Sequence, residues 1–272
     1  MTYYIDLSDK RNIYLKQFLE KKGKIVISFN EMKTNQTFEN GDAFIFSPAK
    51  KIDAEFASKF PSGIIIYCGN LSQDVQKILM QKKIKHVNLL ENEIFAIKNA
   101  ELTAEGVLSL IIENSEKSLQ DNKILILGAG RVAKACANIL KSLNLKFAIA
   151  SYNKEKFPQN NFFSKKNYLG NAFIKDLGKF DVIINTIPAK VFNDTTLDKI
   201  APNAVFIETA SVPCLDETKA KHFNYIKAPG LPQKYCASSA GKLMMKNILG
   251  GLQWRKKLDS LSPAHFVAMK QS

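Results

Sequence analysis

A glycine-rich turn between an apolar strand and a helical run carries the most specific chemistry in the sequence. The chain reads Asn122-Lys-Ile-Leu-Ile-Leu-Gly-Ala-Gly-Arg-Val-Ala133, a G-x-G-x-x-A pattern, followed by a helical run from Lys134 to Leu143. In such a pattern the first glycine permits a tight turn, the second lets the backbone approach a pyrophosphate, and the alanine lets the helix pack on the strand. The free N–H groups at the helix start then bind phosphates. The predicted dinucleotide-binding residues are Gly128, Ala129, Gly130, Arg131, Val132 and Ala133.

The next strand, from Lys146 to Ala150, should end where the adenosine ribose is recognised. At that point the chain has Ser151, Tyr152, Asn153 and Lys154, and the first acidic residue is Glu155, one turn late. Neutral and cationic donors suit a 2′-phosphate, whereas an NAD site uses an acid that accepts from the 2′-hydroxyl. NADP is therefore favoured over NAD. The alternative is that these are solvated turn residues and that Glu155 reaches back.

Polar residues close two further buried strands, Asp181 to Pro188 and Ala204 to Pro213. In doubly wound sheets, ligands bind outside the carboxyl ends of the strands. We therefore expect Thr186, Ile187, Pro188, Ala210 and Ser211 at the cofactor. Asn185 and Glu208 are candidate catalytic residues on the same grounds, although Asn, Thr and Ser before proline also commonly close strands as turn formers.

A proline- and glycine-rich loop from Ala228 to Lys234 is predicted to form a pocket wall, because its residues restrict its shape. A helix should begin at Ser238 and Ser239 and run to about Leu258. The helix start can receive an anion, and lysines can pair with carboxylates. Candidate substrate-binding residues are Pro229, Gly230, Leu231, Pro232, Lys234, Ser238 and Ser239, with Lys190 as a further, catalytic candidate.

Short strands alternate with helical patterns along the whole chain, which is typical of parallel α/β sheets. Strands are expected at 3–6, 24–28, 43–46, 63–67 and 85–89, with helices at 10–22, 53–59 and 72–82. A helix from Leu102 to Leu119, with Thr103 as a candidate cap, should connect two doubly wound domains. We expect a flavodoxin-like domain at 1–100, a connecting helix at 101–120, a Rossmann domain at 121–240, and a C-terminal helix at 241–272 that packs back on the first domain.

Length and charge are consistent with that division. The 272 residues suit two domains of ordinary size. Residues 1–120 hold 16 Lys and Arg against 15 Asp and Glu, whereas residues 121–272 hold 23 against 10. A basic half can attract nucleic acid, a phosphorylated cofactor or an anionic substrate. Since only Arg11, Arg131 and Arg255 are arginines, and nucleic-acid readers rely on arginine forks, nucleic acid is disfavoured.

Several classes of protein are disfavoured by what the sequence lacks. The four cysteines and three histidines show no metal-ligand spacing, so no metal site is expected. The apolar runs are far shorter than the roughly 18 residues that a membrane span needs. Acidic residues near Met1 stand where a signal peptide would be basic, so we expect a cytoplasmic protein.

Taken together, residues of about 100–250 resemble the dipicolinate synthase A subunit family. The resemblance rests on an ordered set of motifs: Thr103-Ala-Glu-Gly106, Leu127-Gly-Ala-Gly-Arg131, Ile184-Asn-Thr-Ile-Pro188, Ala210-Ser211 with Pro213, Ala228-Pro-Gly-Leu-Pro232 and Ala240-Gly241. The family's Pro-Gly-Gly turn is here Pro213-Cys214-Leu215, and the residues before Ala240 also depart from its pattern.

The resemblance implies an NADP-dependent oxidation of a dihydrodipicolinate-type cyclic dicarboxylate to pyridine-2,6-dicarboxylate in sporulating bacteria, with a flavoprotein-like second subunit. Glu208 and Glu105 are the carboxylates we consider as proton acceptors. The alternatives are a shikimate-dehydrogenase-like NADP oxidoreductase, suggested by Asn185-Thr-Ile-Pro188, and a non-catalytic NADP-binding subunit that works with a partner. The oligomeric state stays open, with a homodimer among the options.

Overall fold

The first half of the chain forms a five-stranded parallel sheet with the flavodoxin-like strand order. The computed structural model describes residues 1–33, 35–155 and 163–250. Strands β1 (Tyr3–Ile5), β2 (Val26–Ser28), β3 (Ala43–Ile45), β4 (Ile65–Cys68) and β5 (Lys85–Asn88) are ordered β2-β1-β3-β4-β5. Helices α1 (Lys10–Glu20), α2 (Ala54–Ser58) and α3 (Gln73–Gln81) connect them, with the short 3-10 helices η1 (Phe29–Glu31) and η2 (Leu89–Glu91). The order 2-1-3-4-5 is the flavodoxin order.

The second half forms a six-stranded parallel sheet with the dinucleotide-binding strand order. Its strands are β6 (Ile124–Leu127), β7 (Phe147–Ser151), β8 (Lys166–Leu169), β9 (Val182–Asn185), β10 (Val205–Glu208) and β11 (Asn224–Lys227), ordered β11-β10-β9-β6-β7-β8. Helices α5 (Arg131–Ser142) and α6 (Asp194–Leu197) and the 3-10 helices η4 (Gly170–Lys179) and η5 (Glu217–Lys219) lie between strands. Counted within this sheet, the order is 6-5-4-1-2-3, so the predicted fold class of two doubly wound parallel sheets is confirmed.

Both faces of the second sheet are buried, as the continuous apolar strands require. Ile124 and Ile126 belong to the core under α4 and α5, while Leu125 and Leu127 belong to the core on the opposite face. Because successive side chains on a strand point to opposite faces, a run of four apolar residues serves both cores. Strand β8 was not predicted from the sequence. It is a short edge strand with exposed Lys166 and Leu169, so it lacks that apolar run.

The connecting helix α4 (Glu93–Asn114) begins earlier than expected. Asn92 caps it by accepting from the backbone N–H groups of Ile94 and Phe95. Thr103 is therefore not the cap; its hydroxyl donates to the carbonyl of Asn99 within the helix. The residues between Glu93 and Leu102 contain no glycine or proline, so nothing stops the helix from extending back to Asn92.

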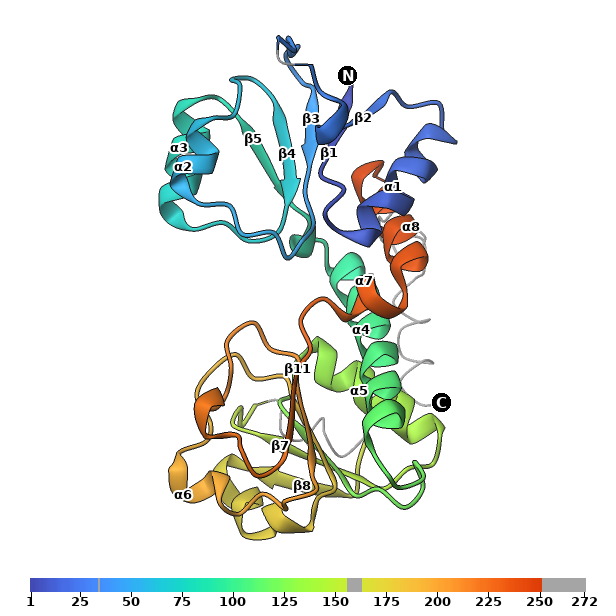
Figure 1. Cartoon of the computed structure of the whole chain (residues 1–272), viewed down its shortest axis with the longest axis vertical. Helices are drawn as coiled ribbons and strands as arrows, with labels where there is room; N and C mark the ends of the chain where they lie inside the picture. Colours follow the sequence, from blue (N-terminus) through green and yellow to red (C-terminus); the bar gives the residue numbers. More distant parts are fainter. Residues whose placement is uncertain (34, 156–162, 251–272) are drawn as a thin grey trace, which may run out of the picture.

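The chain returns from the second sheet to the first through two helices. The expected loop at 228–234 is instead partly helical, because α7 (Leu231–Tyr235) begins directly after Gly230. Helix α8 (Ala237–Ile248) then lies beside α1 (Figure 1). Met244 and Met245 of α8 share one core cluster with Leu15 and Leu19 of α1.

The division at residues 100, 120 and 240 stays a prediction, and residues 251–272 of the predicted C-terminal helix lie outside the described part of the chain. No helix in the described ranges combines the length and apolar character that crossing a bilayer requires.

Candidate cofactor and substrate site

The glycine turn lies where the strand order of the second sheet reverses, between β6 and β9. Gly128 adopts a φ of +119°, and a Cβ built on it would lie 2.2 Å from the Thr186 hydroxyl oxygen. That hydroxyl donates to the carbonyl of Leu127 at 2.8 Å, and the backbone N–H of Thr186 donates to the same carbonyl at 3.0 Å. Thr186 thus holds the ends of β6 and β9 together, and only a glycine fits at position 128.

Gly130 differs from Gly128 because the protein itself does not require a glycine there. Its φ is −82°, and a Cβ at this position would have no atom within 4 Å. Gly130 is the N-cap of α5, where no side chain bonds to the first backbone N–H groups and no acidic residue stands in the first turn. Ala133 is buried against the sheet. An open helix N-terminus next to a position where a side chain would fill free space fits the pyrophosphate of a dinucleotide.

A cavity of about 430 Å³ extends from this turn towards the first sheet. The second half contributes Gly130, Arg131, Val132 and Thr186 to its lining, all of them predicted cofactor residues. The first half contributes Asn70, Asn88, Leu90, Glu91, Ala96, Asn99 and Ala100. The amide of Asn88 donates to the side-chain oxygen of Asn70 at 2.7 Å. The cavity is therefore lined by amides of one sheet and the nucleotide turn of the other.

The sequence interpretation missed this contribution from the first half. Asn70 and Asn88 stand at the carboxyl ends of β4 and β5, so the rule applied to the second sheet would have found them.

Arg131 lies at the first turn of α5, as predicted, and its guanidinium pairs with the side chain of Glu93. Its Nε donates to Glu93 Oε1 at 3.0 Å, and its Nη2 donates to Glu93 Oε2. The guanidinium lowers the pKa of the Glu93 carboxyl through these bonds. Both side chains are about half exposed. Arg131 also lines a second cavity, of about 510 Å³, together with Glu93, Glu101 and Lys134. Arg131 therefore borders both cavities, and Glu93 borders the second.

Asn185 and Glu208, which we considered catalytic, form one buried network. The Asn185 amide donates to Glu208 Oε1 at 2.7 Å and to the carbonyl of Ile187 at 3.0 Å. Its side-chain oxygen accepts from the backbone N–H of Ile187. Glu208 also accepts from the backbone N–H of Ala210 at 3.0 Å and of Cys214 at 2.9 Å. The network thus shapes the turns at 185–188 and 208–214, which contain the predicted cofactor residues Ile187, Pro188, Ala210 and Ser211.

The residues after β7 form a local turn. Ser151 is buried, and its hydroxyl oxygen accepts from the backbone N–H of Asn153 at 3.2 Å. The Tyr152 hydroxyl donates to the side chain of Asn171. Lys154 and Glu155 are both exposed. Ser151 therefore shapes the turn, and Lys154 is the cation that it presents to solvent.

The remaining predicted residues lie apart from the glycine turn or serve packing. Glu105 is exposed on α4, where its carboxylate accepts from the Cys236 thiol at 3.2 Å. Burial, assisted by this carboxylate, raises the pKa of that thiol to about 11. Leu231 and Pro232 are buried in α7, which packs on α4. These two residues were predicted to bind substrate, but the structure gives them a packing role.

Most of the other residues that were predicted to bind substrate are exposed. Lys190, Pro229, Ser238 and Ser239 are exposed, and Gly230 takes the left-handed φ of +66° that begins α7. The Lys234 ammonium lies 4.7 Å from the centroid of the Tyr235 ring. None of these residues lines the two cavities beside the glycine turn.

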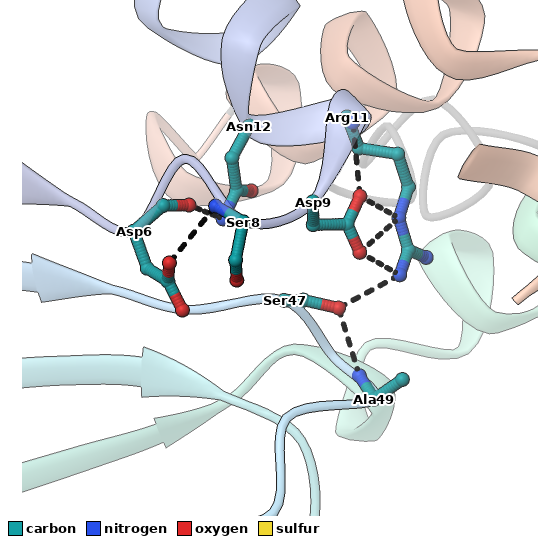
Figure 2. Close-up of polar contacts among 7 residues, drawn as sticks. All are labelled: Asp6, Ser8, Asp9, Arg11, Asn12, Ser47 and Ala49. Atoms are coloured by element: carbon teal, nitrogen blue, oxygen red, sulfur yellow. Dashed lines mark hydrogen bonds and ion pairs between the residues drawn. The ribbon is translucent and has the colours of Figure 1, made fainter. Parts of the chain in front are cut away.

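A second set of polar residues lies at the carboxyl edge of the first sheet and was also missed. Arg11, Asp9 and Ser47 form a buried hydrogen-bonded group (Figure 2). The signal in the sequence was an Asp-x-Arg triplet four residues after the end of β1, in a chain with three arginines. Within the described residues, no group of histidine, cysteine and acidic side chains could hold a metal ion.

Comparisons with known proteins agree with this architecture. Residues 99–221 match the family described as D-isomer specific 2-hydroxyacid dehydrogenase, NAD binding domain. Over 195 residues the chain is 26% identical to the dipicolinate synthase A subunit of Bacillus subtilis (strain 168), an alignment that covers 71% of this chain and 65% of that relative.

Two solved structures share the whole fold. The dipicolinate synthase A subunit from Bacillus halodurans superposes with a TM-score of 0.79 at 19% identity, over 92% of this chain and 97% of the other. The corresponding dipicolinate synthase structure from Bacillus subtilis superposes with a TM-score of 0.76 at 19% identity, over 93% and 95%. With its two parallel sheets and its Rossmann-type half, the chain is similar to the dipicolinate synthase A subunits, in sequence to the Bacillus subtilis relative and in fold to both solved structures.

Proposed function

We propose that this protein is an NAD(P)-dependent oxidoreductase that dehydrogenates a small cyclic dicarboxylate of the dihydrodipicolinate type to pyridine-2,6-dicarboxylate. The observation that carries the proposal is the open N-terminus of α5 at Gly130, located at the reversal point of a Rossmann-ordered sheet. The substrate class comes from the named relative, the dipicolinate synthase A subunit. That relative is named as a subunit, which supports an enzyme of more than one subunit; we further propose, from the family resemblance, a cytoplasmic role in sporulation with a flavoprotein-like second subunit.

The chain's own residues would bind and orient the reactants. When bound, the nicotinamide cofactor accepts the hydride, and the protein supplies position and charge. The backbone N–H groups of Val132 and Ala133 and the Arg131 guanidinium would hold the phosphates. Thr186 and Ile187, held in place by Asn185 and Glu208, would place the nicotinamide end beside the cavity lined by Asn70 and Asn88.

NADP is the cofactor we propose, because the turn after β7 presents a lysine and two neutral polar side chains. Lys154 is exposed and lies within the stretch where the ribose would be recognised. Glu155 directly follows it and would favour NAD if it reached the 2′-hydroxyl. NADP should therefore raise the melting temperature more than NAD does at equal concentration. A larger increase with NAD would contradict the proposed preference and leave the dinucleotide site intact.

The activity is tested by following NADPH absorbance when purified protein, alone and with a flavoprotein-like partner, is given enzymatically prepared dihydrodipicolinate and NADP. The expected result is formation of pyridine-2,6-dicarboxylate, detected by its own absorbance, at a rate that falls with Gly130→Val. Product formed at the uncatalysed rate in every combination, with NADP bound, would overturn the oxidoreductase assignment.

A second candidate is a non-catalytic NADP-binding subunit. It is favoured by the contacts of the two predicted proton acceptors. The Glu208 carboxylate accepts hydrogen bonds from Asn185 and from two backbone N–H groups, and Glu105 is exposed and accepts from the Cys236 thiol. Neither predicted proton acceptor therefore faces the nucleotide turn with free acceptor capacity. Cofactor binding without turnover, in the presence of the partner subunit, would support this candidate.

A further inference from the structure

The first sheet has its own reversal point, between β1 and β3, and a polar group is built there. In the order β2-β1-β3-β4-β5, the chain runs to opposite sides from β1 and β3, so the loops after these two strands meet where the strand order reverses. The loop after β1 contains Asp6 and Asp9 and leads into Arg11 of α1, and the loop after β3 contains Ser47. Ligands in open α/β sheets bind at such points.

Arg11 is the centre of this group. Only 3% of the residue is exposed. Its Nε donates to Asp9 Oδ1 at 2.9 Å, and its Nη2 donates to Asp9 Oδ2 at 2.6 Å and to the Ser47 hydroxyl at 2.8 Å. Asp9 therefore accepts from Nε and Nη2, and Ser47 accepts from Nη2 as well. Nη1 makes no hydrogen bond among the described residues, and Figure 2 shows it turned away from Asp9.

Folding alone gives little reason for this arrangement. A buried ion pair is often no more stabilising than apolar residues of similar volume, because both charges must be desolvated. Nη1 is not among the buried polar atoms that lack a partner, so this nitrogen reaches solvent and is accessible to a ligand. Here the guanidinium is held rigidly by two side chains while one nitrogen keeps its donors, which is how a residue that recognises a ligand is prepared.

The surrounding charges select the kind of ligand. Asp6 pairs with Lys50 at 3.2 Å, so the two acids and two bases of the group balance. The buried Asn12, whose amide donates to the carbonyl of Asp6, keeps a side-chain oxygen without a partner in the described residues. A dianionic phosphate would be repelled by Asp6 and Asp9, whereas a single planar carboxylate needs only the end of one guanidinium.

The backbone of Arg11 is held just as closely. A Cβ on Gly241 of α8 would lie 2.6 Å from the Arg11 carbonyl oxygen, so α8 contacts α1 at this level. Helix α8 follows the chain's return from the second sheet. The backbone of Arg11 is therefore fixed by α8, which packs in the core of the first sheet together with Leu15 and Leu19 of α1.

We propose that Arg11, positioned by Asp9 and Ser47, binds a carboxylate of a small organic acid at the β1–β3 reversal point of the first sheet. The inference rests on the proposed function only for the identity of that acid, for which a substrate or product carboxylate is the natural choice. Arg11 is then a ligand-binding residue supplied by the first half of the chain.

The first experiment follows the arginine side chains of the wild-type protein by NMR, because a chain with three arginines gives few signals to assign. Their side-chain 1H–15N signals are assigned with Arg131→Lys and Arg255→Lys variants. With NADP present, the protein is titrated with pyridine-2,6-dicarboxylate, with malonate, and with uncharged pyridine-2,6-dicarboxamide. The expected result is a saturable shift of the Arg11 signal with at least one dicarboxylate and none with the diamide.

The outcomes separate this inference from the proposed function. A shift with malonate alone supports the Arg11 site and argues against the pyridine dicarboxylate as the ligand. An Arg11 signal that stays unmoved by both dicarboxylates, or that moves equally with the diamide, overturns the inference, whatever the cofactor does.

Variants supply an independent measure. Arg11→Lys keeps the positive charge and loses the paired N–H donors of the guanidinium. Replacing Arg11 alone would leave the buried Asp9 carboxylate without a charge partner, so the double variant Asp9→Asn with Arg11→Gln is used to keep the group neutral. Carboxylate binding should weaken about 10- to 100-fold in the double variant, since a charge-assisted bond is lost. Lys59→Met, which removes an exposed cation on α2 paired with Glu55, is the matched control and should bind as the wild type does. Equal affinity of the double variant and the control would contradict the inference.

Discussion

The hydroxyl of Thr186 occupies the space where a side chain at Gly128 would lie, and it donates to the carbonyl of Leu127 at 2.8 Å. The two residues therefore belong to one structural unit that joins β6 to β9. Gly130, two residues further on, has no such neighbour. The fold therefore requires a glycine at position 128 but not at position 130, which we propose lies against the pyrophosphate.

Gly128→Ala should destabilise the protein by at least about 2 kcal/mol, because alanine disfavours the φ of +119° and its methyl group would displace Thr186. Urea unfolding of the two proteins measures the difference. Gly128→Ala combined with Thr186→Ala tests the steric part, since it removes the hydroxyl oxygen that the new methyl group would meet. An unchanged unfolding midpoint for the single variant would show that the turn can relax.

Gly130→Val should lower the free energy of unfolding by about 1 kcal/mol at most, because valine is a poorer N-cap than glycine, and it should remove dinucleotide binding, because the side chain extends into the space that the pyrophosphate would occupy. A bound dinucleotide at 100 times its Kd stabilises a protein by about 2.7 kcal/mol. That stabilisation should be present in the wild type and absent in the variant. Retained binding in a folded Gly130→Val protein would mean that the turn serves packing alone.

Glu93→Gln should tighten dinucleotide binding up to about fivefold, because Arg131 is then free to pair with phosphate and an exposed ion pair costs little to break. Isothermal titration measures this, with Glu101→Gln as the control that removes an acid from the same helix without touching Arg131. An equal gain in both variants would indicate a general charge effect.

The same pair makes a pH prediction. The pKa of Glu93 is lowered from its ordinary value of 4.5, so the ion pair is fully present above that value and is lost as pH falls through the depressed pKa. Protonated Glu93 no longer holds Arg131. The affinity advantage of Glu93→Gln should therefore be constant near neutral pH and shrink below 4.5. An advantage that grows on acidification would contradict the competition.

Glu208→Gln should cost roughly 1–3 kcal/mol of stability, since an amide cannot accept from both backbone N–H groups and from Asn185 as the carboxylate does. Asn185→Asp should cost a similar amount by placing two carboxylates together. Urea unfolding and turnover are measured for both. Normal stability with lost turnover in Glu208→Gln would assign Glu208 a chemical role in place of its positioning role.

Local sequence patterns determined much of this protein. The run from Asn122 to Ala133 dictates a strand, a turn and a helix start through apolar residues, two glycines and a small residue, all within one short segment. The alternation of strands and helices likewise indicated two parallel sheets, because parallel strands need helical crossovers. These features depend on neighbours in sequence, so they can be read without the fold.

Tertiary structure decided which distant residues meet. Nothing in the sequence pairs Arg131 with Glu93, or Asn185 with Glu208, because these contacts follow from how strands and helices pack. The same reason explains the short edge strand β8, which is defined by pairing with β7 rather than by an apolar run. Burial of Arg11 between Asp9 and Ser47 likewise depends on two loops meeting at the edge of a sheet, and only the folded chain brings them together.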